Sequence, residues 1–393
     1  MRILHVIDSL PRENGGMPAV VVRLAVAQKA AGLEPAIVCH DERALREHIQ
    51  WWSSQVLGFA AVKVIPCGWL PSKAASLVRQ FDVVHVHGVW TPVPTMMCWH
   101  ALRAGVPTLL APHGMLSTWS LEQKRPRKAL SLALIWRRLV RNVTFLHALN
   151  QAEQQELAAR FRGTDIRVIP NGIFAEEFAD LPHRGDSARV IPTLVDGRRY
   201  VLFLARLHFM KAPDLLIDAF ARLAASVPDV DLVVAGPDYG MEATLRSQIR
   251  ELGLSERVHL PGAVYGRAKL ALLRDALCMC QPSRHEGFSV SMLEALACGV
   301  PVVTTQTANF PEVATEGAGF IAAADSESVS AALLALVQDE ELRSRQSAAA
   351  RELVSRRYTW EAVQGCALRV YDEAIATARA RGRASRAPGT KAR

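Results

Sequence analysis

Two glutamates eight residues apart follow a short apolar run and could recognise a sugar nucleotide. The segment SRHEGFSVSMLEALACGVPVVTT places Glu286 in a loop and Glu294 about one turn inside the helix that follows. The amides of Gly287, Phe288 and Ser289 then lie at the helix N-terminus, a site suited to phosphate. Carboxylates on either side of an anion site suit hydroxyl groups. The spacing also fits an exposed loop acid and a glutamate on the helix surface.

A pair of cations marks the segment LFLARLHFMKAPDLL. Arg206 ends an expected strand, and Lys211 precedes a helix that has Pro213 near its first position. Two cations beside helix N-terminal amides can neutralise a diphosphate without a metal ion. The alternative is a pair of solvated surface cations.

Two weaker signals lie nearer the N-terminus. Gly15 and Gly16 follow the first expected strand and would allow close backbone approach to a ligand, although the pair is not GxGxxG and fits an ordinary tight turn. His113, in APHGML after another strand, could offer an imidazole to a reacting sugar. A lone histidine is more often structural.

His85 and His87 alternate along one expected strand, so their side chains share a face. An HxH pair can hold zinc, but the sequence indicates no third ligand nearby. We therefore expect no metal and no other cofactor.

These residues must be positioned by repeated strand and helix segments. The chain has 393 residues, which favours two domains, and half of them are apolar. Short β-branched runs alternate with helical patterns, which predicts an α/β protein with two Rossmann-like, doubly wound parallel sheets facing a cleft. Ligands of such sheets bind beyond the carboxyl ends of the strands. The expected segments are 1–172 and 199–357 as domains, 173–198 as a linker, 358–378 as a helix returning to the first domain, and 379–393 as a basic disordered tail.

The net charge of +8 is concentrated in two places. Residues 119–142 carry seven Lys/Arg and one Glu, and six more Lys/Arg follow Glu373. The first segment mixes Trp119 and Trp136 with the apolar stretch ALSLALIW, a composition typical of helices at anionic membrane surfaces. A core-packed helix whose cations face solvent, or line an acceptor site, is the alternative.

No apolar run reaches the ~18–20 residues that span a bilayer. The opening MRILHVID is too short for a signal peptide and is interrupted by Asp8. Seven cysteines without a CxxC pair favour free thiols in a reducing compartment. These features predict a cytoplasmic protein, peripheral at most to the inner face of the plasma membrane.

The order of the motifs resembles the retaining glycosyltransferases of group 1 (family four), which have the GT-B fold. It runs from GG at 15 and PHG at 112 through IPNG at 169, R-x4-K at 206 and AGP at 235 to E-x7-E at 286. The resemblance covers about residues 2–375, and the last two charged motifs are its most specific part. One departure is Ala212, where the family often has glycine.

The resemblance implies a nucleoside diphosphate sugar as donor and a saccharide or lipid-linked saccharide as acceptor. Arg206 and Lys211 would hold the diphosphate and stabilise the leaving group. Glu286 would bind sugar hydroxyls, Glu294 the ribose, and His113 would lie beside the donor sugar. Gly16 would let the first loop reach the phosphates.

Other functions remain open at this point. A nucleotide-dependent oxidoreductase would need GxGxxG and an acid about 20 residues later, which the first glycine pair lacks. A nucleic-acid-binding protein would use the basic tail, but that tail has no aromatic residue to stack on bases, so no nucleic acid is expected. A glycogen-type polymerase or sucrose-type synthase would leave the basic segment unexplained. The transfer would serve bacterial polysaccharide or lipopolysaccharide synthesis.

Overall fold

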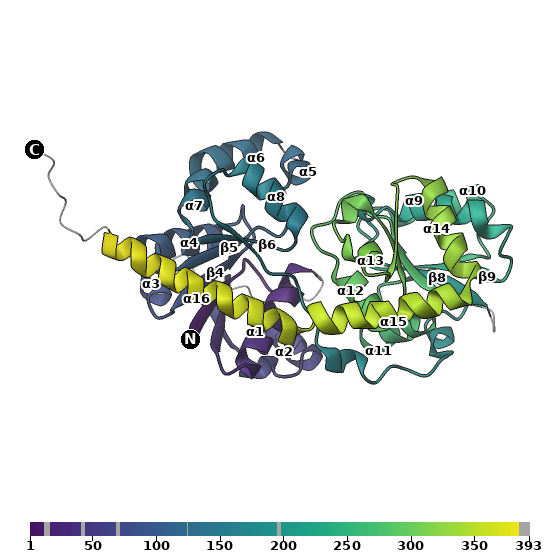
Figure 1. Ribbon diagram of the computed structural model, residues 1–393, viewed down its shortest axis with the longest axis horizontal. Helices are drawn as coiled ribbons and strands as arrows, with labels where there is room; N and C mark the ends of the chain where they lie inside the picture. The colour runs from purple at the N-terminus through teal and green to yellow at the C-terminus, as the bar shows by residue number, and fades with distance from the viewer. Residues whose placement is uncertain (12–15, 41–43, 68–70, 124, 195–197, 385–393) are drawn as a thin grey trace, which may run out of the picture. The chain divides into compact units, whose positions relative to one another are not determined.

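The computed structural model describes residues 1–11, 16–40, 44–67, 71–123, 125–194 and 198–384. The chain forms two compact units (Figure 1). The first unit comprises Met1–Asn171 with Trp360–Arg393, and the second comprises Gly172–Thr359. The α/β class with two Rossmann-like units is confirmed.

The first unit is built on a seven-stranded sheet whose strands pair in parallel, in the order β3-β2-β1-β4-β5-β6-β7. Its strands are β1 (Arg2–Val6), β2 (Glu34–His40), β3 (Lys63–Cys67), β4 (Val83–His87), β5 (Thr108–Ala111), β6 (Phe145–Ala148) and β7 (Ile166–Val168). Its helices are α1 (Met17–Ala30), α2 (Leu45–Gln55), α3 (Pro71–Val78), α4 (Pro92–Ala104), α5 (Thr118–Glu122), α6 (Arg125–Ser131), α7 (Arg137–Asn142), α8 (Gln151–Arg160) and α16 (Trp360–Ala384), with a π-helical turn at Leu132–Trp136.

The two faces of this sheet differ in chemistry. Val84 and Val86 of β4 point into an apolar core shared with α3, α4 and α7. His85 and His87 alternate with them and are fully buried on the opposite face, which α1 and α16 cover (Figure 1). A buried strand face made of histidines demands hydrogen-bond partners.

The second unit carries a six-stranded sheet, also paired in parallel, in the order β10-β9-β8-β11-β12-β13. Its strands are β8 (Arg199–Leu204), β9 (Val230–Ala235), β10 (Val258–Gly262), β11 (Cys278–Gln281), β12 (Val302–Thr305) and β13 (Gly319–Ala322). Its helices are α9 (Pro213–Ala224), α10 (Glu242–Glu251), α11 (Gly266–Asp275), α12 (Val290–Ala297), α13 (Glu312–Thr315), α14 (Ser326–Gln338) and α15 (Glu340–Arg357).

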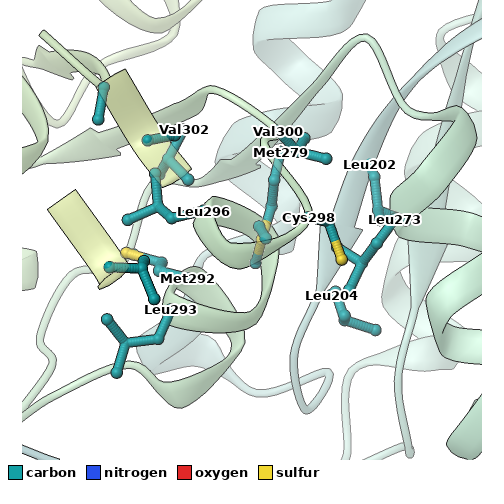
Figure 2. Close-up of a cluster of buried hydrophobic side chains, with 14 of the residues drawn as sticks. Leu202, Leu204, Leu273, Met279, Met292, Leu293, Leu296, Cys298, Val300 and Val302 are labelled. Carbon is teal, nitrogen blue, oxygen red and sulfur yellow. The ribbon is translucent and has the colours of Figure 1, made fainter. Parts of the chain in front are cut away.

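Both faces of this second sheet are apolar. Along β8, Leu202 and Leu204 pack into one buried cluster, whereas Phe203 packs into the other. Figure 2 shows part of the first cluster, which also contains Met292 and Leu296 of α12. This packing holds α12 against the sheet and fixes where its N-terminus lies.

Two sequence predictions were wrong in detail, and one strand was not predicted. The expected linker 173–198 is part of the second unit: it contains 3-10 helices at Ala175–Phe178 and Asp186–Arg189, and its Ile173, Phe178 and Ile191 are buried in the core. Prolines and glycines removed the periodicity that would have revealed this. Strand β13 was not predicted, and α16 continues to Ala384, beyond the expected end at 378. Residues 385–393 of the expected tail lie outside the described residues.

Candidate functional site

The two charged motifs of the second unit meet through their loops. The backbone amides of Arg284 and His285 donate hydrogen bonds to the carbonyl of Met210, at 2.8 and 3.4 Å. The Arg284 guanidinium also forms a bidentate pair with Asp214, at 2.7 and 2.8 Å. These contacts bring the loop that carries Lys211 beside the loop that carries Glu286.

Lys211 and Glu286 form an ion pair with little exposure, 12% and 9% for the two side chains. The same carboxylate accepts a hydrogen bond from the Gln281 amide at 2.9 Å. The Asn309 amide holds the backbone carbonyl of Glu286 at 2.8 Å. Glu286 is therefore not the exposed loop acid that the sequence left open, because a cation and an amide already satisfy its carboxylate.

Gln281 also organises the start of α12. Its carbonyl oxygen accepts from the hydroxyls of Ser289 and Ser291, at 3.1 and 3.0 Å, and Ser289 caps the helix by accepting from the amide of Met292. One buried amide thus links Glu286 to this helix N-terminus. The second acid of the motif, Glu294, is paired with Lys269 at 2.6 Å and is not a solvated surface glutamate.

Gly287 and Phe288 are the other two residues of this loop whose amides were expected to lie at a helix N-terminus suited to phosphate. Phe288 packs its ring against Phe310 and Tyr358, with centroids 5.7 and 5.9 Å apart. Aromatic packing of this kind fixes the course of the loop before the helix.

The loop that carries Lys211 also carries a second cation, Arg206. Arg206 is exposed at the end of β8, with its guanidinium carbon 5.1 Å from the centroid of the Tyr239 ring. Partial burial, and then the charges of Arg206 and Lys211, lower the pKa of His208. His208 therefore lies close enough to Arg206 and Lys211 to respond to the charge of both.

Backbone geometry explains two of the small residues. Ala212 has a left-handed backbone with φ 54°, which accounts for the glycine that the family often has there. Gly236 of the AGP motif has φ 155°, and a β-carbon there would lie 1.8 Å from the carbonyl oxygen of Ala205. In the first unit, Gly16 has φ 85° and begins α1, while Gly15 lies outside the described residues.

His113 of the first unit follows β5 in a strained turn, with φ 51°. Glu153 holds this turn: its carboxylate accepts from the amide of Gly114 at 2.7 Å and from that of Leu149 at 2.8 Å. Burial raises the pKa of Glu153. The backbone conformation of this turn, held by Glu153, therefore positions the half-buried imidazole of His113.

A chain of hydrogen bonds runs inward from His113. Its Nε2 lies 3.0 Å from Nδ1 of His87, whose Nε2 lies 3.0 Å from Nδ1 of His5. Nε2 of His5 lies 2.7 Å from the amide oxygen of Gln28 on α1. Burial lowers the pKa of His5 to about 4 and that of His113 to about 3.

The chain continues from Gln28 through the C-terminal helix. The Gln28 amide donates to the Tyr371 hydroxyl at 3.0 Å, and that hydroxyl lies 2.9 Å from Nδ1 of His85. Nε2 of His85 lies 3.0 Å from Nδ1 of His147, whose Nε2 lies 2.7 Å from the carbonyl of Ile169. Burial also lowers the pKa of His147, to about 4, and that of His85.

The prediction that His85 and His87 have no third partner was wrong. His5 stands directly beside His85 in the strand register, and nitrogens of His5, His85 and His87 lie within 4.8 Å of one another. Both ring nitrogens of each of these three histidines are nevertheless committed to hydrogen bonds along the chain. A metal ion would have to break several of these bonds.

Sequence reasoning missed the residues that support the site. Gln281, Lys269 and Arg284 lie within or near the recognised motifs but have no spacing of their own. The histidine chain joins residues from β1, β4, β6, α1 and α16, so only the strand register reveals it. The HxH pattern was its single sequence signal.

Comparisons with known proteins agree with this architecture. Residues 15–172 match the family model of the glycosyl transferase 4-like domain, and residues 186–353 match that of glycosyl transferases group 1. Among solved structures, Anabaena HepE in complex with UDP-glucose matches with a TM-score of 0.73 at 21% identity, covering 95% of this chain and all of that one. WaaG, a glycosyltransferase involved in lipopolysaccharide biosynthesis, matches with a TM-score of 0.68 at 15% identity, covering 93% and 98%.

Curated relatives cover nearly the whole chain. A phosphatidyl-myo-inositol mannosyltransferase of Mycobacterium leprae is 31% identical over 92% of this chain and 94% of its own length. A GDP-mannose:cellobiosyl-diphosphopolyprenol alpha-mannosyltransferase of Xanthomonas campestris is 26% identical over 96% and 98%. With both family models matched in order on two Rossmann-like units, the chain belongs to the group 1 glycosyltransferases of GT-B fold.

Proposed function

We propose that the protein transfers a hexose, with retention of anomeric configuration, from a nucleoside diphosphate sugar to a saccharide or lipid-linked saccharide acceptor. The observation that carries the proposal is the ion pair of Lys211 with Glu286 just before the N-terminus of α12, with the exposed Arg206 at the start of the loop that carries Lys211. Cations suit the diphosphate, and the adjacent carboxylates suit sugar hydroxyls. The product would belong to bacterial polysaccharide, lipopolysaccharide or glycolipid synthesis.

The chemistry of the step follows from these groups. As the bond between the anomeric carbon and the diphosphate breaks, negative charge grows on the leaving oxygens. Arg206 and Lys211 offset that charge from fixed positions, so little reorganisation is needed when it develops. The acceptor hydroxyl attacks the face from which the diphosphate leaves, and its proton passes to the departing phosphate. We assign no carboxylate nucleophile.

Glu286 has a specific part in this scheme. Without donor, its carboxylate neutralises Lys211. A bound diphosphate would compete for the same cation, which would release the carboxylate to accept from sugar hydroxyls. Glu294, paired with Lys269, is carried over as the ribose contact, and His113 of the first unit as the group beside the donor sugar.

The names of the relatives suggest which donors and acceptors to test first. The Mycobacterium leprae and Xanthomonas campestris relatives are mannosyltransferases, and their names contain an inositol lipid and a polyprenol diphosphate. HepE was crystallised with UDP-glucose. GDP-mannose and UDP-glucose are accordingly the first donors, with lipid-linked acceptors.

Transfer of labelled sugar from each donor into a membrane lipid extract tests the function. The anomeric configuration of the product, read from its NMR coupling constants, tests retention. A product with the donor's configuration supports the proposal, and an inverted product contradicts it.

Chelation is expected to leave transfer intact. Because Arg206 and Lys211 can neutralise the diphosphate, we propose that no metal ion takes part. Activity should be unchanged within error after EDTA treatment and dialysis. A complete loss of transfer that added Mg²⁺ or Mn²⁺ restores would contradict this.

We further propose that residues 125–141 contact an anionic membrane surface. Three apolar side chains there are exposed, Leu130 by 61%, Leu134 by 70% and Ile135 by 44%. Exposed cations flank them at Arg125, Arg127, Arg137, Arg138 and Arg141. Exposed apolar side chains and exposed arginines in one short segment fit the acyl chains and the anionic headgroups of a membrane surface.

Two residues of this segment do not take part in the proposed surface. Trp136 is 1% exposed and packs beside Trp90 in the core, so it is no membrane anchor. Lys128 donates to the Ser120 hydroxyl at 3.1 Å and is committed within the protein. Lys124 lies outside the described residues. No helix within the described ranges is long and apolar enough to cross a bilayer.

Replacing Leu130, Leu134 and Ile135 together with glutamine is expected to weaken binding to anionic vesicles at least ~tenfold, since each side chain loses apolar burial in lipid. Sedimentation with vesicles that contain phosphatidylglycerol measures this. The matched control is Leu57→Gln, which alters a 96% exposed leucine of the same unit. Equal loss in both variants, or in neither, would reject the surface.

A further inference from the structure

We propose that Gln28 and Tyr371 fix one tautomer of His113, with its proton on Nε2, so that Nδ1 can only accept a hydrogen bond. This inference rests on the proposed function for its ligand, which is a hydroxyl group of the bound sugar. Neither Gln28 nor Tyr371 would touch substrate, so both act as positioning residues through the buried histidines.

The direction of the chain is set at its inner end. The Ile169 carbonyl can only accept, so His147 must carry its proton on Nε2 and present a bare Nδ1. His85 must then donate from Nε2 to that nitrogen and present a bare Nδ1 to Tyr371. The Tyr371 hydroxyl therefore donates to His85, and its oxygen accepts from the Gln28 amide.

The orientation of Gln28 passes this direction onward. Since its NH₂ group faces Tyr371, its oxygen faces His5, which must donate from Nε2. His5 then accepts at Nδ1 from Nε2 of His87, and His87 accepts at Nδ1 from Nε2 of His113. With neutral rings, this is the one arrangement that satisfies all seven hydrogen bonds.

The surroundings of the five imidazole rings favour their neutral form. His5, His85 and His87 are each 0% exposed and His147 is 3% exposed, and no carboxylate joins the chain to stabilise an imidazolium. Burial lowers the pKa of all five histidines, which agrees with the geometry. Among the described contacts, Nδ1 of His113 has no partner, so a lone pair is left at the half-buried end of the chain.

This arrangement gives His113 a defined chemistry. A neutral ring with a bare Nδ1 accepts from a hydroxyl and cannot donate to a phosphate or carbonyl oxygen at that atom. The opposite tautomer would turn an N–H toward the sugar and require the hydroxyl to accept. The hydrogen-bond chain therefore selects a hydroxyl donor as the partner of His113.

The wild-type protein provides the first test. Nitrogen-15 NMR of the full chain, labelled at its histidines and recorded at pH 7 without donor, distinguishes a protonated from a bare ring nitrogen. His113→Gln assigns the signals of His113. The proposal requires protonated Nε2 and bare Nδ1 on His113, and a proton on its Nδ1 overturns it.

Gln28→Met then tests what sets the tautomer. Methionine has a similar shape but offers His5 no strong acceptor, and a buried N–H without a partner is costly. The ring proton of His5 is expected to move from Nε2 to Nδ1. The ring protons of His87 and His113 are then expected to move from Nε2 to Nδ1 as well, so the His113 tautomer inverts. Gln364→Met is the control, because Gln364 is another buried glutamine of this unit and its side chain has no hydrogen-bond partner among the described residues. It should leave the tautomer unchanged, whereas an unchanged tautomer in Gln28→Met overturns the proposal.

Tyr371→Phe is the second variant, in case Gln28→Met does not fold. Without the hydroxyl, either end of the Gln28 amide can face His5, so both tautomers of His113 should be populated. Tyr200→Phe is its control, since that buried tyrosine donates to Leu272 at 2.7 Å in the other unit. A single unchanged tautomer in Tyr371→Phe overturns the proposal.

Activity separates this inference from the proposed function. Gln28→Met should lower kcat/KM roughly tenfold, the usual worth of one hydrogen bond, while Gln364→Met should not. An inverted tautomer with unchanged kcat/KM would overturn the role of Nδ1 in transfer. A wild type without transferase activity but with the expected tautomers would reject the function and leave the hydrogen-bond chain supported.

Discussion

Replacing Arg206 by methionine is expected to lower kcat/KM by about 30- to 1000-fold, which corresponds to ~2–4 kcal/mol of lost transition-state stabilisation. The cation would no longer offset the charge that develops on the leaving diphosphate. Because Arg206 is exposed and has no ion pair among the described residues, its removal leaves no buried charge behind. The folded protein should therefore keep its thermal stability.

Steady-state kinetics with the best donor measure the effect. Arg246→Met is the matched control, because Arg246 is a half-exposed arginine of the same unit, paired with Glu242 on α10. Lys211→Met should cost a similar loss of activity and also reduce stability, since it leaves the carboxylate of Glu286 without its cation. Unchanged kcat/KM in both Arg206→Met and Lys211→Met would remove the diphosphate role.

Mild acid is expected to destabilise the first unit strongly. His5 and His147 have folded pKa values of about 4, whereas unfolded histidine titrates near 6.5. Below about pH 6.5 these histidines bind protons in the unfolded chain but not in the folded chain, so the free energy of unfolding falls as the pH falls. At pH 5 each of these two histidines should cost ~2 kcal/mol, or ~4 kcal/mol together.

The lowered pKa values of His85 and His87 add to this effect, while the raised pKa of Glu153 opposes it. Urea denaturation followed by tryptophan fluorescence isolates the first unit, because all eight tryptophans fall within its residues. The midpoint should drop clearly between pH 7 and pH 5. An equal midpoint at both pH values would show that the buried histidines are not held neutral.

The sequence was sufficient for the fold and for the charged motifs. Strands read from apolar runs, such as those that became β8 and β9, need only local patterning. Arg206, Lys211 and Glu286 follow the neighbouring parallel strands β8 and β11, so the proximity of their loops follows from the topology of the sheet. The family resemblance that these motifs carried is confirmed by the comparisons.

What could not be predicted depends on contacts between distant segments. The ion pair of Lys211 with Glu286 spans 75 residues, and the bond between Gln28 and Tyr371 spans 343. The strand β13 follows Gly317 and begins at Gly319, and glycine weakens the pattern of a short strand. The segment around Trp136 has the composition of a membrane-surface helix, which suggested that this tryptophan contacts lipid. In the structure Trp136 is instead buried in the core of the first unit.

Donor binding tests the central claim most directly. Scanning calorimetry of the wild type and of Arg206→Met, with GDP-mannose, UDP-glucose or ADP-glucose, compares the melting of the second unit. A ligand at 100 times its Kd stabilises the folded state by ~2.7 kcal/mol. The account predicts that at least one nucleotide sugar raises this melting temperature in the wild type, and raises it much less in Arg206→Met. No shift with any of the three, or an equal shift in both proteins, would contradict the assignment of the second unit as the donor site.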